Sequence, residues 1–446
     1  MRRDTFPLGG VHPPQRKYTA DRPIIALDPP AEAVVFMNQH LGAPAQPLVQ
    51  KGDQVRVGTL IGRSRGFISA NIHSPVSGKV IKIEPRIDIS GYRRTAVVIE
   101  TQGDDWEDSV DLDDTPTRKI SFTPDKIIKT IESLGVVGMG GAAFPSHIKY
   151  MLPENKKADT LIVNGVECEP YLTADHRLML EKPDQIMQGI EVMKKAGRIS
   201  YALVGIEANK PDAIDLLAEK AKFYPGTEIR SLRVKYPQGA EKQLIKALLN
   251  REIPGGGLPM DVGCIVNNIG TAYAIYQAVV HHRPLVDRVV TLAGSGLKNP
   301  GNYRVRVGTS VREMLNLAGD QMPPDTEKVI MGGPMTGKAI LDLGMPVSKG
   351  TSGILFQNRR ECSSGPSLNC IRCGRCIAVC PMGLRPYLLE KLCRMKNFQR
   401  AEQERVMDCI ECGSCAYGCP SGIPLVEYIK YGKNRVLEIM KKRREK

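Results

Sequence analysis

Short apolar runs separated by turn residues dominate the first part of the chain. After a Pro-rich opening segment at residues 1–30, which we expect to be extended, such runs occur at 34–36, 60–61 and 80–83. Brief apolar runs bounded by glycine, proline and other turn formers are typical of strands. The pattern therefore predicts an all-β domain over residues 31–100.

The middle of the chain alternates between two periodicities. Strand-like apolar runs at 160–164 and 201–204 are separated by a stretch with apolar residues at helical spacing near 183–197. This alternation predicts an α/β domain over residues 123–283. Residues 284–356 return to short β runs around one helical stretch, an order that predicts a small β-grasp (SLBB-like) domain.

Cysteines organise the next segment, residues 357–424. The pattern Cys-x2-Cys-x2-Cys-x3-Cys-Pro occurs there twice, and the fourth Cys of each copy precedes Pro381 or Pro420. This is the run of bacterial ferredoxins, in which three thiolates hold one [4Fe–4S] cluster and the fourth reaches the other cluster. The spacing predicts cluster 1 on Cys370, Cys373, Cys376 and Cys419, and cluster 2 on Cys409, Cys412, Cys415 and Cys380.

Zinc and disulfides are the alternatives for these cysteines. Zinc sites use four ligands, usually as two separated pairs, and not an evenly stepped run that is repeated. Disulfide frameworks suit small secreted domains, whereas this chain has 446 residues and no apolar signal segment at its start. Two iron–sulfur clusters are the interpretation that the pattern favours.

The charge of the chain adds little to this picture. Its formal net charge is +14, from 62 Lys and Arg against 48 Asp and Glu, and only 5% of its residues are aromatic. No basic–aromatic motif for nucleic acid occurs, so nucleic acid is not an expected partner. Positive charge gathers in residues 425–446, where we expect a helix and a basic tail. Residues 101–122 are acidic and predict a solvated linker.

Localisation follows from two further observations. No apolar run approaches the length of about 18 residues that a membrane-spanning helix needs, so no transmembrane span is expected. Iron–sulfur thiolates suit a reducing compartment. We therefore expect a cytoplasmic protein that lies against a membrane only through its partners.

Four polar loops stand out in the α/β region, at residues 138–145, 164–170, 236–242 and 267–271. Three of them directly follow apolar runs, and α/β folds place ligand-binding loops at the carboxyl ends of strands. Glycines let backbone approach a ring or a phosphate, and adjacent asparagines offer both donors and acceptors. For any single loop, ordinary turn formation is at least as good an explanation. Four in series favour a nucleotide site.

A fifth glycine-rich stretch, Gly332 to Lys338, nearly spells a phosphate-binding P-loop. The residue that follows is Ala339, so the hydroxyl that would bind Mg²⁺ is missing, and Pro334 removes a backbone amide. The sequence predicts a turn of the β-grasp domain rather than an ATP site.

The four loops, taken in order, resemble those of the flavin- and NADH-binding subunit of respiratory complex I. The all-β region resembles a lipoyl-type barrel-sandwich domain, but no lysine lies between Arg65 and His73, where a carrier protein would present one. A barrel-sandwich domain in front and a two-cluster ferredoxin domain behind closely resemble the C subunit of the Rnf electron-transport complex. The opening Thr5-Phe6-x-x-Gly9-Gly10-Val11-His12-Pro13 strengthens this resemblance.

The resemblance implies an FMN site and an NADH site. Ala143 and Ala240 depart from the complex I pattern, which leaves the nicotinamide contacts less defined. FMN is expected against Gly140, Gly141, Lys149, Asn164, Glu167, Asn267, Asn268 and Thr271, and Gly239 is expected as a further cofactor-binding residue. NADH is expected near Phe144, Glu169, Tyr236 and Glu241.

The implied function is that of an NAD-linked oxidoreductase subunit. It would carry electrons between NAD(H), FMN and two [4Fe–4S] clusters in a membrane-associated, ion-translocating ferredoxin:NAD⁺ oxidoreductase. Other subunits would hold the ion path and receive ferredoxin, and this chain would lie peripherally on the cytoplasmic side of the cell membrane. Two alternatives stay open: a soluble flavin/iron–sulfur reductase, similar to the cobalamin reductase of microcompartments, and a non-catalytic adaptor that only relays electrons.

Overall fold

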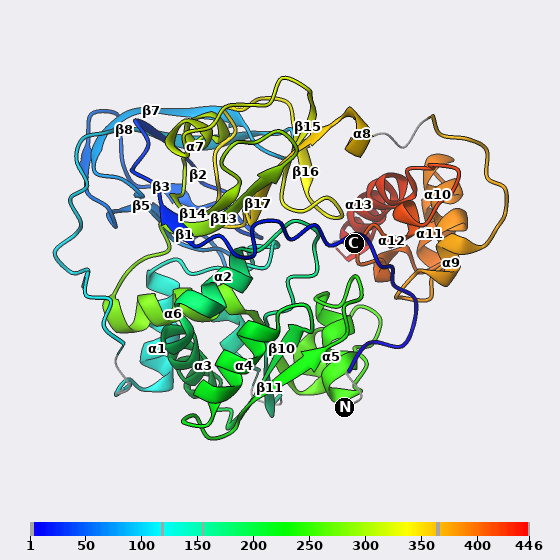
Figure 1. Ribbon diagram of the computed structural model, residues 1–446, viewed down its shortest axis with the longest axis horizontal. Helices are drawn as coiled ribbons and strands as arrows, with labels where there is room; N and C mark the ends of the chain where they lie inside the picture. The colour runs from blue at the N-terminus through cyan, green and yellow to red at the C-terminus, as the bar shows by residue number, and fades with distance from the viewer. Residues whose placement is uncertain (1–3, 117–119, 154–155, 363–365, 445–446) are drawn as a thin grey trace.

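A parallel sheet with its helices forms the lower half of the molecule in Figure 1, and two β-rich units lie above it. The computed structural model describes residues 4–116, 120–153, 156–362 and 366–444. A helical unit from the C-terminal part of the chain lies to one side, and the N-terminal segment runs across the middle of the view. The predicted multidomain α/β architecture is confirmed. The exact boundaries of the six predicted segments stay a prediction.

The barrel-sandwich unit consists of two small antiparallel sheets, ordered β2-β8-β7-β4 and β3-β5-β6. Their strands are β2 (Glu32–Phe36), β3 (Gln46–Pro47), β4 (Gln54–Val55), β5 (Leu60–Arg63), β6 (Ile72–His73), β7 (Gly78–Ile87) and β8 (Arg93–Thr101). Side chains that alternate along β2 and β8, such as Val35 and Val97, are fully buried between the sheets. Val34 and Val98 on the opposite faces are buried in a second cluster, so both faces are covered and the apolar runs that predicted these strands are continuous.

Burial of His73 in this unit leads to a prediction about acid stability. Burial, together with the nearby charges of Lys349 and His282, lowers the pKa of His73 to about 3. The unfolded chain, with an ordinary histidine pKa of about 6.5, therefore binds one proton more than the folded protein between these values. The free energy of unfolding should fall as the pH drops below 6.5, and His73 should contribute about 2 kcal/mol of that loss by pH 5.

The measurement is urea unfolding at pH 7 and pH 5, followed by the fluorescence of Trp106, which is the single tryptophan and bridges Val57 of this unit. We expect His73→Leu to reduce the difference between the two pH values by about 2 kcal/mol. An unchanged difference would show that His73 is not a source of the acid sensitivity.

The α/β unit is built on a parallel sheet in the order β11-β10-β9-β12. Its strands are β9 (Thr160–Asn164), β10 (Tyr201–Glu207), β11 (Thr227–Leu232) and β12 (Cys264–Asn268). Its helices are α1 (Pro124–Ser133), η1 (Ser146–Tyr150), α2 (Ala174–Glu181), α3 (Pro183–Gly197), α4 (Pro211–Ala221), α5 (Glu241–Leu249), η2 (Pro259–Val262) and α6 (Ile269–His281). Asn164 pairs with Asn268 in the register of β9 and β12, which brings two predicted loops to one edge of the sheet.

Two local features fix the helices that flank this edge. The side chain of Asn268 caps α6 by accepting hydrogen bonds from the backbone N–H groups of Gly270 and Thr271. Helices α3 and α6 cross at Gly189, where an added Cβ atom would lie 2.0 Å from the carbonyl oxygen of Ala272. Only glycine allows that approach, so the close packing of α6 against α3 depends on it.

The β-grasp unit contains a mixed six-stranded sheet in the order β1-β14-β13-β17-β15-β16. Its strands are β13 (Asp287–Gly294), β14 (Gly301–Arg306), β15 (Thr326–Met331), β16 (Lys338–Ile340) and β17 (Gly353–Asn358), with α7 (Val311–Leu317) on one face and α8 (Arg359–Cys362) after the last strand. The first strand, β1 (Ile24–Ala26), comes from the N-terminal segment and pairs with β14. Part of the opening segment, which was expected to be extended, thus forms an edge strand of this sheet.

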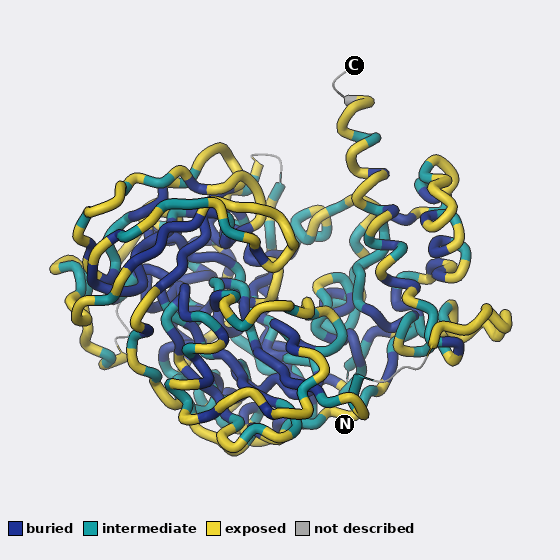
Figure 2. Tube along the Cα trace, turned by 90° about the horizontal axis from the view of Figure 1, so that it is seen from above, coloured by how far each residue is buried: buried dark blue, intermediate teal, exposed yellow. Residues whose placement is uncertain are grey.

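The C-terminal unit is helical. Its elements are α9 (Arg375–Ala378), α10 (Pro386–Arg394), α11 (Phe398–Gln403), η3 (Val406–Asp408), α12 (Ser414–Tyr417) and α13 (Leu425–Arg444). Buried Leu389, Ile429 and Val436 join α10 to α13, while the end of α13 projects from the body and is exposed (Figure 2). No helix among the described residues has both the length and the hydrophobicity to cross a membrane. Arg2, Arg3 and Lys446, at the basic ends of the chain, lie outside the described residues.

The N-terminal segment, residues 4–20, which we call the strap, connects two units. Val11 pairs with Tyr236 of the α/β unit, and the backbone N–H of Gly10 donates to the carbonyl of Val379 at 2.9 Å. An added Cβ atom at Gly9 would lie 2.5 Å from the carbonyl carbon of Cys380. The strap therefore packs directly against the backbone of a predicted cluster ligand.

The acidic linker is held more firmly than the prediction of a solvated segment allowed. Asp104 accepts two hydrogen bonds of 2.8 Å from Arg306, and Asp114 forms ion pairs with Lys182 and Arg283. These basic partners come from residues distant in sequence. A local charge pattern could not reveal the pairing.

Candidate cofactor sites

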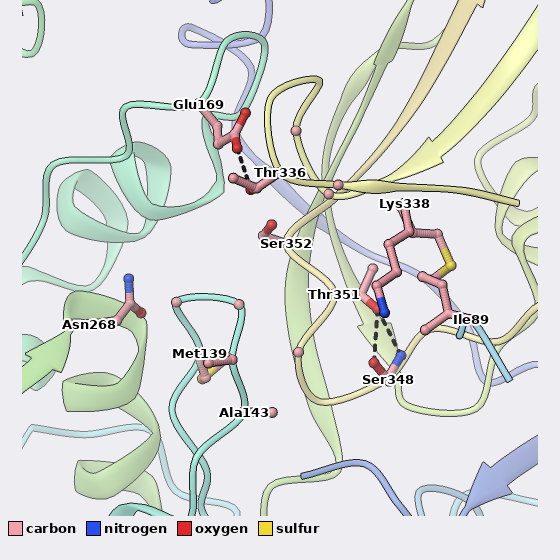
Figure 3. Close-up of a pocket in the computed structure, with 18 of the residues that line it drawn as sticks. Ile89, Met139, Ala143, Glu169, Asn268, Thr336, Lys338, Ser348, Thr351 and Ser352 are labelled. Carbon is pink, nitrogen blue, oxygen red and sulfur yellow. Dashed lines mark hydrogen bonds between the residues drawn. The ribbon is translucent and has the colours of Figure 1, made fainter. Parts of the chain in front are cut away.

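A cavity of about 580 Å³ opens where the three sheet-containing units meet (Figure 3). Its volume lies within the usual range of ligand pockets, roughly 300–1,000 Å³. The predicted nucleotide-binding residues that line it are Gly140, Gly141, Asn164, Glu167, Glu169, Gly239 and Asn268. The cavity thus gathers residues from all four loops, including the 236–242 loop through Gly239.

The glycine loop forms one floor of the cavity. Gly141 has a φ of +112°, which favours glycine, and an added Cβ atom there would meet nothing within 4 Å. An added Cβ atom at Gly140 would lie 3.4 Å from Cβ of Asn268. The loop therefore exposes bare backbone to the cavity, which is the surface that a flat ring needs for close stacking.

Two carboxyl groups lie at the start of α2, beside this floor. Glu167 accepts hydrogen bonds from the backbone N–H of Asp175 at 2.7 Å and of His176 at 3.3 Å. Burial, together with the charge of Glu167, raises the pKa of Asp175 to about 7. Asp175 in turn accepts a hydrogen bond of 2.6 Å from the side-chain amide of Asn268. The sequence did not single out Asp175, because α2 begins with polar residues and shows no helical apolar face.

Glu169 lines the cavity and is hydrogen-bonded to a loop of the β-grasp unit. Its carboxylate accepts hydrogen bonds from the hydroxyl of Thr336 at 2.5 Å and from the backbone N–H of Met335 at 3.0 Å. Burial raises the pKa of Glu169. The loop between β15 and β16, predicted as a mere turn, therefore reaches the nucleotide loops and lines the cavity (Figure 3).

Other predicted residues lie behind the floor rather than on it. Thr271 is buried and its hydroxyl accepts from the backbone N–H of Met139 at 2.9 Å, which supports the glycine loop from below. Asn267 donates to the hydroxyl of Tyr150 at 2.9 Å. Lys149 donates to the carbonyl of Val266 at 2.5 Å. Phe144, Lys149, Tyr236, Glu241, Asn267 and Thr271 are not among the residues that line the cavity.

Two lysines, the half-buried Lys17 and the buried Lys210, hold the loop that carries Glu167 and Glu169. The ammonium group of Lys17, from the strap, donates to the carbonyls of Glu167, Glu169 and Leu172 at 2.6–2.9 Å. Lys210 donates to the carbonyl of Val166 at 2.7 Å. Burial lowers the pKa of Lys17 to about 8. These contacts fix a loop in which Glu167 and Tyr171 have positive φ values of 46° and 69°, a strained conformation for such residues.

The cysteines predicted for cluster 2 surround a small apolar cavity. Cys380, Cys409, Cys412 and Cys415 all line it, together with Leu384, Leu389, Val426 and Ile429. Burial, together with the neighbouring thiols of Cys409, Cys412 and Cys380, raises the pKa of Cys415. Four thiols converging on one hollow fit a cubane cluster. The fourth of them comes from the first copy of the motif.

The cysteines predicted for cluster 1 lie nearer the surface. Cys370 and Cys373 are exposed, and Cys376 and Cys419 are half-buried. Burial raises the pKa of Cys376, and the nearby thiols of Cys419 and Cys370 raise it further. Cys376 is therefore near Cys419, the fourth cysteine of the other copy. This is required if each copy supplies its fourth cysteine to the cluster of the other copy.

The cluster 2 side of the helical unit faces the nucleotide loops. The hydroxyl of Tyr236 donates to the carbonyl of Cys412 at 2.7 Å. An added Cβ atom at Gly413 would lie 2.8 Å from the carbonyl of Met335, the residue that also contacts Glu169. Tyr236 and the 332–338 loop therefore lie between the cavity and the cysteines of cluster 2.

A glycine-floored cavity at the carboxyl ends of parallel strands, beside an eight-cysteine ferredoxin unit, defines a flavin- and iron–sulfur-dependent electron-transfer protein. The chain matches four known domain families in order. Residues 5–104 match the RnfC barrel sandwich hybrid domain and residues 131–277 the Nuo51 FMN-binding domain. Residues 289–339 match the SLBB domain and residues 368–423 the 4Fe-4S dicluster domain.

Curated relatives cover nearly the whole chain. It is 44% identical over 433 residues to the C subunit of the proton-translocating ferredoxin:NAD(+) oxidoreductase complex of Clostridium ljungdahlii, covering 96% of this chain and 93% of that protein. It is 40% identical to the C subunit of the Na(+)-translocating complex of Acetobacterium woodii, covering 90% of each. The chain belongs to the RnfC family, the C subunits of ion-translocating (Rnf) oxidoreductase complexes.

A solved structure shows the same fold over part of the chain. An NAD⁺-reducing [NiFe]-hydrogenase in the H₂-reduced state aligns with a TM-score of 0.50 at 18% identity, covering 72% of this chain and 63% of that one. At this identity the likeness concerns the fold alone.

Proposed function

We propose that the protein is the NAD-linked, flavin- and iron–sulfur-carrying subunit of a membrane-associated ferredoxin:NAD⁺ oxidoreductase that translocates ions. The observation that supports this most strongly is the contact of three features: the glycine-floored cavity, the loop that carries Tyr236, and the cysteines of cluster 2. FMN suits such a junction because nicotinamide exchanges two electrons, whereas an iron–sulfur cluster exchanges one.

The residues of this chain bind and position the groups. The backbone of Gly140 and Gly141 would underlie the flavin ring, with Asn164, Glu167 and Asn268 beside it. Thr271, Asn267 and Lys149 would act from behind, by fixing the loops. The further predicted contacts, which stay part of the proposal, are Phe144, Glu169, Tyr236, Gly239 and Glu241.

The two cysteine sets have different surroundings, which suggests different duties. The set of cluster 2 lies against the α/β unit through Cys412 and against the strap through Cys380. The set of cluster 1 presents Cys370 and Cys373 at the surface. The first arrangement suits exchange of electrons within the chain, and the second suits exchange with a partner protein.

The proposed location is the cytoplasmic side of the cell membrane, held by partner subunits. Relatives are named as subunits of complexes, and thiolate clusters suit a reducing compartment. The described end of α13 carries Lys441, Lys442 and Arg443, all exposed, which would favour an acidic partner surface or anionic lipid. The proton or the sodium ion would pass through the partners.

Anaerobic titration with NADH tests the catalytic part of this proposal. Protein loaded with FMN and iron–sulfur clusters should show bleaching of the flavin absorbance, followed by that of the clusters. Retention of no FMN, or absence of bleaching, would favour the non-catalytic adaptor. Fractionation of the native host tests the partners: recovery in the membrane fraction supports the complex, and recovery wholly apart from membranes supports a soluble reductase.

A further inference from the structure

Across the cavity from the glycine loop lies a wall that none of the predicted nucleotide-binding residues belongs to. It consists of the barrel-sandwich segment 38–41 and of the β-grasp residues Lys338, Ser348 and Thr351. Figure 3 shows these three β-grasp side chains gathered on the side opposite Met139 and Asn268. We refer to segment 38–41 and these three residues as the far wall.

The far wall is within reach of a molecule that lies on the glycine loop. The backbone N–H of Leu41 donates to the carbonyl of Ala143 at 3.1 Å. An added Cβ atom at Gly350, between Ser348 and Thr351, would lie 3.3 Å from the carbonyl of Gly141. The barrel-sandwich and β-grasp units thus both touch the loop, and the two sides of the cavity form one site.

Gln39 and His40 of the far wall each bury a polar atom that has no partner among the described residues. Gln39 is 6% exposed, and its Oε1 accepts from the backbone N–H of Lys349 at 3.0 Å, but its Nε2 is unpaired. His40 is 7% exposed, and its Nε2 lies 2.8 Å from the carbonyl of Ala43, so Nε2 carries the proton and Nδ1 is an unpaired acceptor. Burial keeps this imidazole neutral by lowering its pKa to about 4.

An unpaired amide donor and an unpaired imidazole acceptor, on consecutive residues that line the cavity, suit hydroxyl groups. A hydroxyl both donates and accepts, so hydroxyl groups can satisfy the amide of Gln39 and the imidazole of His40. A ribose or ribityl chain offers several such groups, whereas an apolar ring offers none. The chemistry of these two residues therefore indicates the sugar part of a nucleotide.

The rest of the far wall suits a phosphate. The four carboxyl groups that line the cavity all accept hydrogen bonds: Asp88 from Asn38, Glu169 from Thr336, Glu167 from the backbone N–H of Asp175, and Asp175 from Asn268. This leaves the ammonium group of Lys338 available at the cavity. The hydroxyl of Ser348 lies 3.1 Å from that of Thr351 on the same wall (Figure 3). An ammonium group beside hydroxyls is a common phosphate-binding set.

We propose that the far wall is a sugar–phosphate subsite of the nucleotide cavity. Gln39 and His40 bind sugar hydroxyls, and Lys338, Ser348 and Thr351 bind the adjoining phosphate. The inference rests on the proposed function, since it deepens the same site. The ribityl phosphate of FMN and the ribose phosphates of the dinucleotide share this chemistry, and the experiment distinguishes between them.

The experiment compares wild-type protein with Lys338→Ala, Gln39→Glu and the control Lys328→Ala, which changes an exposed lysine of β15 outside the cavity. One arm measures the dissociation constants of FMN and of riboflavin, which lacks the phosphate, by flavin fluorescence with flavin-free protein. The other measures kcat/KM for NADH and for 1-benzyl-1,4-dihydronicotinamide, which lacks both sugar and phosphate. Lys338→Ala should weaken one phosphate-bearing ligand by about tenfold, as expected for one lost charge-assisted hydrogen bond.

Each outcome assigns or removes the subsite. If Lys338→Ala binds FMN more weakly than wild-type protein does but binds riboflavin equally well, the subsite holds the phosphate of the flavin. If kcat/KM of Lys338→Ala falls for NADH but not for the benzyl analogue, the subsite holds a phosphate of the dinucleotide. Gln39→Glu should weaken the binding of the same ligand, because the change replaces a hydrogen-bond donor with a negative charge. If wild-type protein works and both variants match it in both arms, the subsite is overturned and the proposed function stands. If wild-type protein binds neither nucleotide, both are overturned.

Discussion

Replacing Cys380 by Ala is expected to remove the cluster held mainly by the other copy of the cysteine motif. Cys380 lies with Cys409, Cys412 and Cys415 around one hollow, although it belongs to the first copy in the sequence. The variant should therefore lose cluster 2 and keep cluster 1. Its iron content should fall from about eight to about four atoms per protein, and NADH should no longer reduce the remaining cluster.

Double variants decide which cysteines share a cluster. If Cys380 and Cys419 each bind the cluster of the other copy, the double variant Cys380→Ala/Cys415→Ala should hold about four iron atoms. Either single variant should hold the same number, because both residues bind one cluster. Cys380→Ala combined with Cys376→Ala should hold almost none. The opposite pattern would show that each copy binds its own cluster. Cys393→Ala is the matched control, since Cys393 lies in α10 away from this hollow.

Replacing Lys17 by Met is expected to release the flavin. The change removes three hydrogen bonds to the loop that carries Glu167 and Glu169 and leaves three part-buried carbonyl groups without this donor. Each unsatisfied buried acceptor costs about 1–3 kcal/mol. A loss of about 3 kcal/mol in the bound geometry corresponds to roughly 100-fold weaker FMN binding. Flavin fluorescence on dilution of the loaded protein measures it.

Two comparisons separate this local effect from general unfolding. Lys222→Met removes a surface lysine whose ion pair with Glu219 is mostly exposed, so FMN affinity should not change. Iron content should also stay at the wild-type value in Lys17→Met, because the predicted cluster ligands do not hydrogen-bond to Lys17. Wild-type FMN affinity in Lys17→Met would show that the loop keeps its shape without the strap.

Much of the fold followed from the sequence because local patterns were strong. The run at residues 160–164 became β9 with the same limits, since every residue but the last is buried. Proline at the first turn and glycine at the last marked α3 at both ends. By contrast, β11 escaped notice because it is an edge strand of half-buried polar residues, with only Leu232 buried.

The site was predictable only where a loop carries its own signal. Gly140, Asn164 and Asn268 lie in loops after apolar runs, and the structure brings them to one cavity. Gln39 and Lys338 belong to other units, and nothing near them in sequence relates them to the glycine loop. Asp175 also lacks a sequence signal, because what distinguishes it is its burial beside Glu167. Contacts between units depend on packing, which periodicity does not encode.

The strap also constrains the order in which the protein can be completed during synthesis. Gly10 is made early, but its hydrogen-bond partner Val379 emerges from the ribosome about 370 residues later. At about 5–20 residues per second, this delay is roughly 20–75 s. For much of that interval the partners of Lys17, in the loop at residues 167–172, have already been made. The partners of Gly9 and Gly10, Cys380 and Val379, have not. The contact of the strap with the cysteine unit is thus formed late, when the cysteines of that unit are themselves being made.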